Sequence, residues 1–130
     1  MDQSINIMIL SHYFYPEIGA AANRMYDHAQ VWAEKGANIV VITNNPNYPN
    51  GRLLPGYKNI NQKETIVGVN VVRIKTYISP NTFFFKRLLN YITYMVRAII
   101  VGRNYKNTDI IIATTPQLFC GVAGLILSKI

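Results

Sequence analysis

Small residues at the end of an apolar run offer the clearest opportunity for binding chemistry in this sequence. Gly19 and Ala20 follow the apolar run 5–11 and stand where a helical pattern begins. A helix N-terminus favours an anion, and small side chains let backbone N–H groups approach a phosphate closely. A dinucleotide fingerprint requires Gly-x-Gly-x-x-Gly, whereas a single glycine is present here. A phosphate could therefore bind at the start of this helix, and the sequence disfavours a dinucleotide-dependent dehydrogenase.

Polar and aromatic side chains flank this turn. Tyr15 and Glu17 precede it, and Arg24 follows it. Glu17 is the only acid in the segment 13–24, so no pair of carboxylates is available there for acid/base catalysis. Two roles for Glu17 stay open, namely orientation of Arg24 and contact with a ligand hydroxyl. The sequence identifies no catalytic residue.

A second polar segment, 44–61, is too long and too rich in Asn, Pro, Gly and Tyr for a plain connection. Asn47 and Asn50 offer hydrogen-bond donors and acceptors that suit the hydroxyls of a ligand. Tyr48 offers a flat ring that can lie against a ligand, and Arg52 offers a fork for a phosphate. The alternative is that these residues serve turn formation alone.

The stretch 82–105 is predicted to form a long amphipathic helix. At about 100° per residue its apolar and polar positions fall on separate arcs. The apolar arc contains Leu88, Tyr91, Ile92, Met95, Val96 and Ile99, and the polar stripe contains Lys86, Asn90, Thr93, Arg97 and Asn104. A spanning helix needs about 20 mostly apolar residues, and Arg97 interrupts the longest candidate.

The start of this helix combines aromatic and basic side chains, which is typical of a helix that lies in the surface of an anionic leaflet. A core helix packed on a sheet is the other interpretation, and the two are compatible. The residues expected to contact a membrane are Phe83, Phe84, Phe85, Lys86, Arg87 and Arg97.

The remaining pattern predicts an α/β protein with a doubly wound, mainly parallel sheet. Expected strands cover 5–11, 38–43, 64–67, 69–75 and 109–114, and expected helices cover 20–35, 82–105 and 117–130. Gly36 is expected to cap the first helix in the left-handed conformation. The two short strands that flank Gly68 are expected to pair with each other.

Composition limits the size and the partners of the protein. A chain of 130 residues with 50% hydrophobic content suits one domain, and a net charge of +7 favours anionic partners. His12 could bind substrate or cap its loop, whereas His28 is expected on a solvated face. Cys120 is expected to be a core thiol, because a single cysteine supports neither an intrachain disulfide nor a multi-cysteine metal site.

Five segments in order resemble the amino-terminal half of family 4 glycosyltransferases. They are Tyr-Phe-Tyr-Pro-Glu-Ile-Gly-Ala-Ala at 13–21, Asn-Asn-Pro-Asn-Tyr-Pro-Asn-Gly-Arg at 44–52, Pro-Gly-Tyr at 55–57, Ser-Pro-Asn at 79–81 and Ala-Thr-Thr-Pro-Gln at 113–117. The likeness covers essentially the whole chain. It is strongest to the colanic-acid, O-antigen and capsule branch, which includes N-acetyl-L-fucosamine transferases.

The resemblance implies a GT-B enzyme with two Rossmann-like domains, of which residues 1–130 form the acceptor-side domain. Such an enzyme retains anomeric configuration, needs no metal or other cofactor, and moves a sugar from a UDP- or GDP-sugar to an acceptor, here expected to be a polyprenyl-diphosphate-linked saccharide. The resemblance places Gly19 and Ala20 at the donor diphosphate. The expected acceptor contacts are Tyr15, Glu17, Arg24, Asn47, Tyr48, Asn50 and Arg52.

Donor binding in that family depends mainly on the carboxyl domain, so we expect this chain to be inactive alone. The last predicted helix is apolar and has no cap, which suggests a truncated domain. The N-terminal residues carry an acid and no basic segment before an apolar run, so we expect a cytoplasmic protein, peripheral on the inner face of the plasma membrane. The alternative function is a basic module that binds nucleic acid or phosphate without catalysis, although the basic residues are scattered and no nucleic-acid motif is present, so nucleic acid is not the expected partner.

Overall fold

The computed structural model describes residues 4–11, 13–16, 20–46, 53–76, 84–113 and 118–129, except the side chains of residues 20, 21, 84, 87 and 118–121. Five strands and three helices lie in this part of the chain. Their bounds are β1 Asn6–Leu10, α1 Ala20–Glu34, β2 Asn38–Asn44, β3 Gln62–Ile66, β4 Val69–Ile74, α2 Phe84–Gly102, β5 Ile110–Ala113 and α3 Leu118–Ser128. Each predicted helix and strand is confirmed, with ends that differ by a few residues.

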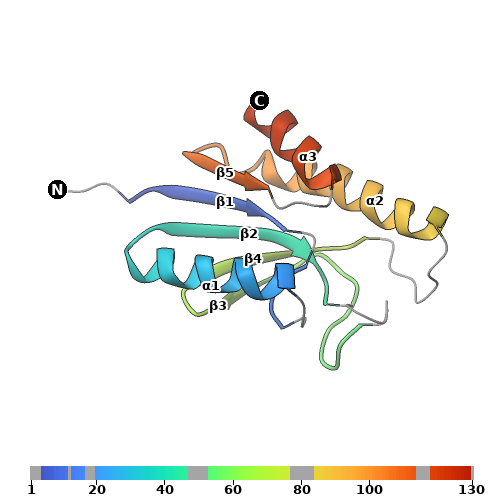
Figure 1. Cartoon of the computed structure of the whole chain (residues 1–130), viewed down its shortest axis with the longest axis horizontal. Helices are drawn as coiled ribbons and strands as arrows, with labels where there is room; N and C mark the ends of the chain where they lie inside the picture. Colours follow the sequence, from blue (N-terminus) through green and yellow to red (C-terminus); the bar gives the residue numbers. More distant parts are fainter. Residues whose placement is uncertain are drawn as a thin grey trace.

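The strands form one mixed sheet in the order β3-β4-β2-β1-β5. β1 pairs in parallel with both β2 and β5, and β2 pairs in parallel with β4. Only β3 runs antiparallel, against β4. The arrows of the four parallel strands point to the same side of the molecule, where α1 and α2 begin (Figure 1). The prediction of an α/β protein with a mainly parallel sheet is therefore confirmed.

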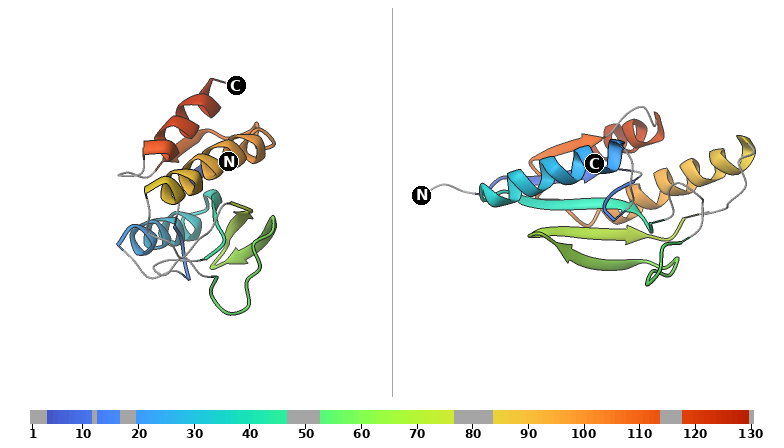
Figure 2. Two further views of the ribbon diagram at one scale, coloured as in Figure 1. Left: turned by 90° about the vertical axis from the view of Figure 1, so that its right-hand side faces the viewer. Right: turned by 60° about the horizontal axis from the view of Figure 1, so that its bottom comes forward.

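Helices cover both faces of the sheet. α1 lies on one face, while α2 and α3 lie together on the other (Figure 2). β1 explains this arrangement, because successive side chains of a strand point to opposite faces. Met8 and Leu10 are buried in the core beneath α2 and α3, whereas Ile9 is buried in the core beneath α1. A strand that is apolar at every position after Asn6 thus contributes to two cores.

Two glycines adopt the backbone conformations that their positions require. Gly36 has a φ of 97° and its N–H donates to the Ala33 carbonyl at 3.0 Å, so the predicted cap of α1 is confirmed. Gly68 has a φ of 81° in the two-residue turn between β3 and β4. Its neighbour Val67 also has a positive φ, 46°, which is unfavourable for a β-branched residue. The turn therefore holds a strained side chain.

Helix α2 is rotated relative to the predicted apolar arc. Its deeply buried side chains are Tyr94 and Ala98, which the sequence did not place on that arc, whereas Val96 of the arc is 45% exposed. The reason is a hydrogen bond, since the Tyr94 hydroxyl donates to the Ile42 carbonyl of β2 at 2.6 Å. A tyrosine can face a core when its hydroxyl has a partner there. None of the described helices is both long enough and apolar enough to cross a bilayer.

Candidate ligand site at the carboxyl edge of the sheet

The carboxyl ends of β1, β2 and β4 bring polar residues together at one edge of the sheet. Ser11 follows β1, Asn44 and Asn45 lie at the end of β2, and Thr76 follows β4. All four are buried. Ligands of open α/β sheets bind outside this edge, where loops leave the strands and helices begin. The location matches the edge at which the sequence places its candidate residues.

Arg73 of β4 connects the segments at this edge through hydrogen bonds of its buried side chain. Its side chain is completely buried, and its Nε donates to Glu64 Oε2 at 3.0 Å. Its Nη1 donates to the Asn44 carbonyl at 3.0 Å, and its Nη2 donates to the Tyr15 carbonyl. A guanidinium has five N–H donors in a rigid fork, which suits contacts in several directions. Arg73 thereby joins the loop after β1, the end of β2 and strand β3.

Tyr57 extends this network to the segment that precedes β3. Its hydroxyl donates to Glu64 Oε1 at 3.1 Å, and its ring centroid lies 5.4 Å from Arg73 Cζ. Burial raises the pKa of Tyr57 above its ordinary value; the charge of Arg73 opposes this shift and the charge of Glu64 adds to it. Tyr57 is therefore a neutral hydrogen-bond donor at physiological pH.

Asn45 holds the other end of the same segment. Its Nδ2 donates to the Ile60 carbonyl at 3.0 Å, and its Oδ1 accepts from Gln62 Nε2 at 2.7 Å. Asn59 continues the network, because its Nδ2 donates to the Thr76 carbonyl at 2.7 Å. The Leu54 N–H also donates to the Pro46 carbonyl at 3.0 Å. These bonds fix the points at which the chain leaves β2 and returns to β3.

Tyr15 presents an aromatic surface at this edge. Its ring stacks on Tyr26 of α1, with centroids 4.6 Å apart and an interplanar angle of 22°. Phe14 is buried and meets Tyr26 edge to face at 6.0 Å. Tyr15 itself is 46% exposed. The stack is thus supported from below and open to solvent above, as a platform for an apolar sugar face would be.

The Arg73–Glu64 ion pair and the Tyr15 ring differ in what they can offer to a ligand. Arg73 and Glu64 satisfy each other and the backbone, so they position loops and do not offer a free charge to a ligand. Tyr15 offers exposed ring surface where it stacks on Tyr26, in the N-terminal half of α1. Backbone N–H groups in the first turn of the same helix favour an anion. Among the described residues no group of three His, Cys, Asp or Glu side chains is arranged to hold a metal ion.

The predicted site residues fall into two sets. Tyr15 and Arg24 are both exposed, Tyr15 at the carboxyl edge and Arg24 on α1, and Ala20 begins α1. The others, Glu17, Gly19, Asn47, Tyr48, Asn50 and Arg52, lie outside the described residues, as does His12.

Of the predicted membrane contacts, Phe85 and Arg97 are exposed and Lys86 is half-buried. Phe83 lies outside the described residues, and the side chains of Phe84, Arg87 and Cys120 are not described. His28 is exposed on α1 and stacks on Trp32 with centroids 5.3 Å apart, so its predicted solvated position is confirmed.

Sequence reasoning missed the buried network of Arg73, Glu64, Tyr57 and Asn45. The pairing of the two strands that flank Gly68 contained one signal for the ion pair. Glu64 pairs with Val71 across the β3–β4 hairpin, so Arg73 is its diagonal neighbour on the same face of the sheet. The hairpin register therefore predicts the ion pair, although it does not predict that the arginine is buried.

Comparison with known proteins gave no match: no protein-family model, no curated protein and no solved structure is significantly similar to this chain.

Proposed function

We propose that this chain is the acceptor-side domain of a retaining GT-B glycosyltransferase that acts in bacterial surface polysaccharide synthesis. Its partner in this role is a second Rossmann-like domain that holds a UDP- or GDP-sugar. The acceptor is a saccharide linked to polyprenyl diphosphate. The observation that carries the proposal is the stack of exposed Tyr15 on Tyr26, which lies at the carboxyl edge of a mainly parallel sheet and contacts the N-terminal half of α1.

The stack suits a sugar for a physical reason. One face of a pyranose is apolar, and an exposed aromatic ring binds it at low entropic cost because the ring has few rotatable bonds. The first turn of α1, which precedes Tyr26 in the same helix, supplies backbone N–H groups and the positive end of the helix dipole for a diphosphate. The five ordered sequence segments support the same assignment, and three of them begin in the sequence at or just after the end of a parallel strand, β1, β2 or β5.

A lipid-linked acceptor requires access to a membrane, and α2 supports such access. Four apolar side chains of α2 are exposed along one stripe: Phe85 76%, Leu89 46%, Val96 45% and Ile100 57%. We call these four residues the α2 stripe. Exposed Arg97 lies beside it, exposed Arg103 continues it, and α2 contains no acidic residue. An exposed apolar stripe with basic neighbours suits the surface of an anionic leaflet.

The direct test is calorimetric titration of the chain with a short-tail polyprenyl-diphosphate N-acetylglucosamine. Binding is expected, and Tyr15→Ala should weaken it by about tenfold, since a stacked ring contributes on the order of 1 kcal/mol or more. His28→Ala is the matched control, because it removes another exposed, stacked ring from α1 and should leave binding unchanged.

Two outcomes would contradict the proposal. One is the absence of binding to both this acceptor and anionic vesicles. The other is equal binding by Tyr15→Ala and the unaltered chain. A labelled oligonucleotide serves as the counter-probe, and a salt-dependent shift at low micromolar protein would favour the alternative of a basic nucleic-acid module.

A further inference from the structure

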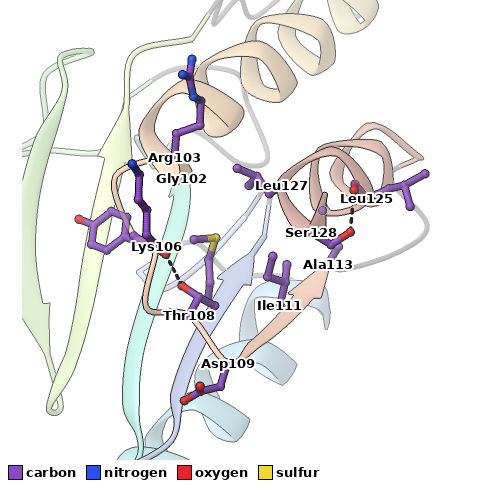
Figure 3. Close-up of a pocket in the computed structure, with 13 residues that line it drawn as sticks. Gly102, Arg103, Lys106, Thr108, Asp109, Ile111, Ala113, Leu125, Leu127 and Ser128 are labelled. Atoms are coloured by element: carbon purple, nitrogen blue, oxygen red, sulfur yellow. Dashed lines mark hydrogen bonds between the residues drawn. The ribbon is translucent and has the colours of Figure 1, made fainter. Parts of the chain in front are cut away.

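A cavity of about 720 Å³ lies away from the carboxyl edge, between the end of α2, the turn that leads into β5, and α3. Its inner wall is apolar and includes Met8, Ile111 and Leu127. Figure 3 shows Ile111 and Leu127 at its centre, with Arg103 and Lys106 on the side of α2 and Ser128 on the side of α3. Cavities that bind small molecules usually have volumes of about 300–1,000 Å³. The size is thus sufficient for one flexible ligand.

Two glycines set the walls of this cavity. A Cβ at Gly102 would come within 2.7 Å of Leu127 Cδ1, and a Cβ at Gly124 would come within 3.3 Å of Ala113 Cβ. The absence of side chains therefore lets α3 approach α2 at one point and β5 at another. The space left between these two contacts and the turn at 103–109 is the cavity.

The charge at the mouth is positive. Arg103 and Lys106 are both exposed, and neither forms an ion pair with any residue that the structure describes. Asp109 is the only acid in the lining, and its Oδ2 accepts a hydrogen bond from the Asn6 N–H at 2.9 Å. The carboxylate thus has a partner in the fold, while the two cations face solvent. An apolar wall with a cationic rim suits a ligand that has an apolar chain and an anionic head.

We propose that this cavity binds one molecule of an alkyl phosphate, with its chain against Met8, Ile111 and Leu127 and its phosphate between Arg103 and Lys106. Arg103 directly follows α2, and its N–H donates to the Ile99 carbonyl at 3.1 Å, which continues the helical hydrogen bonding by one residue. The α2 stripe therefore leads to the mouth of the cavity. A single-chain lipid phosphate in a leaflet would reach the site along this stripe.

The test is calorimetric titration of the chain with dodecyl phosphate below its micelle concentration. Saturable binding of one molecule per chain is expected. Two further probes separate the parts of the ligand: dodecyltrimethylammonium has the same chain with the opposite charge, and inorganic phosphate has the charge without the chain. Both should bind at least about tenfold more weakly, since binding requires the charge and the chain together.

Two variants locate the site. Ser128→Trp places a large ring at the exposed edge of the lining and should abolish binding of dodecyl phosphate. Arg103→Glu should weaken it by about tenfold. Lys35→Glu is the matched charge reversal at the end of α1, outside this cavity, and should have no effect. Circular dichroism confirms that each variant is folded.

The proposal is overturned by any of three results: no saturable binding, equal affinity for inorganic phosphate and dodecyl phosphate, or unchanged affinity in both Ser128→Trp and Arg103→Glu. It stands independently of the proposed function. Tyr15→Ala alters only the carboxyl edge and Ser128→Trp alters only the cavity, so the two proposals can fail separately.

Discussion

Arg73 Nε lies 3.0 Å from Glu64 Oε2, although the arginine side chain is completely buried and the glutamate side chain is 30% exposed. The ion pair therefore joins a buried positive charge to a negative charge that is partly exposed to solvent. Because both other guanidinium nitrogens donate to backbone carbonyls, the arginine has partners on every side. Such a group stabilises its surroundings only while every partner is in place.

Glu64→Gln should consequently destabilise the fold. The substitution removes the negative charge and leaves the Arg73 guanidinium buried without a counterion, so we expect a loss of about 2–3 kcal/mol in the free energy of unfolding. Urea denaturation measures this loss. Glu34→Gln, at the exposed end of α1, is the control and should change stability by less than about 0.5 kcal/mol. Equal stability of the two variants would show that the ion pair does not hold this edge.

The contribution of Tyr57 to the free energy of unfolding depends on pH. Its pKa is raised above 10.0 in the folded state, mainly by burial, so the folded state favours the neutral phenol. Its contribution to stability is fully present below the unfolded pKa and is lost as pH rises through the folded pKa. The difference in unfolding free energy between the unaltered chain and Tyr57→Phe should therefore shrink as the pH rises above about 9 and past the ordinary tyrosine pKa of about 10. A difference that stays constant over this range would contradict the assignment.

A single substitution in the turn between β3 and β4 should increase the stability of the protein. Val67 and Gly68 both have positive φ, and Asn-Gly is the preferred pair for a two-residue turn of this kind. Val67→Asn should raise the free energy of unfolding by about 1 kcal/mol. Gly68→Ala should lower it, because it adds a side chain at a φ of 81°. Thermal unfolding of both variants checks these opposite signs, and a less stable Val67→Asn would be the contrary result.

The α2 stripe should determine binding to membranes. Ile100→Asp places a charge in the stripe and should weaken binding to vesicles that contain phosphatidylglycerol by about tenfold. Val31→Asp is the matched control, because Val31 is also an exposed, β-branched apolar side chain but lies on α1, on the other face of the sheet. Sedimentation with vesicles measures the effect. Equal weakening by both variants would indicate general charge repulsion and not a specific contact surface.

The elements of the fold could be predicted because their signals are local. β1, β2 and β5 are short and apolar at nearly every position, and Gly36 ends α1 where a left-handed cap is expected. The orientation of α2 could not be predicted in the same way. Helical periodicity identified an apolar arc, but the burial of Tyr94 depends on a carbonyl of β2 that is 52 residues away in the sequence.

The site could be predicted only in part for a similar reason. Tyr15 was identified from its position after an apolar run, and the structure adds the ring of Tyr26 beneath it. Arg73 was missed because its three partners come from separate segments, at Tyr15, Asn44 and Glu64. Periodicity treats an arginine in a strand as solvent-facing, and only the assembled sheet edge makes its burial favourable.

The central claim is that the carboxyl edge of the sheet binds a lipid-linked saccharide. Its most direct test is a map of backbone amide chemical shifts during titration with a short-tail polyprenyl-diphosphate N-acetylglucosamine, performed on the Ser128→Trp variant so that the cavity beside α3 is blocked. The largest changes are expected in Tyr15, Tyr26 and the residues that follow β2. Changes confined to other parts of the molecule, or none at saturating ligand, would contradict it.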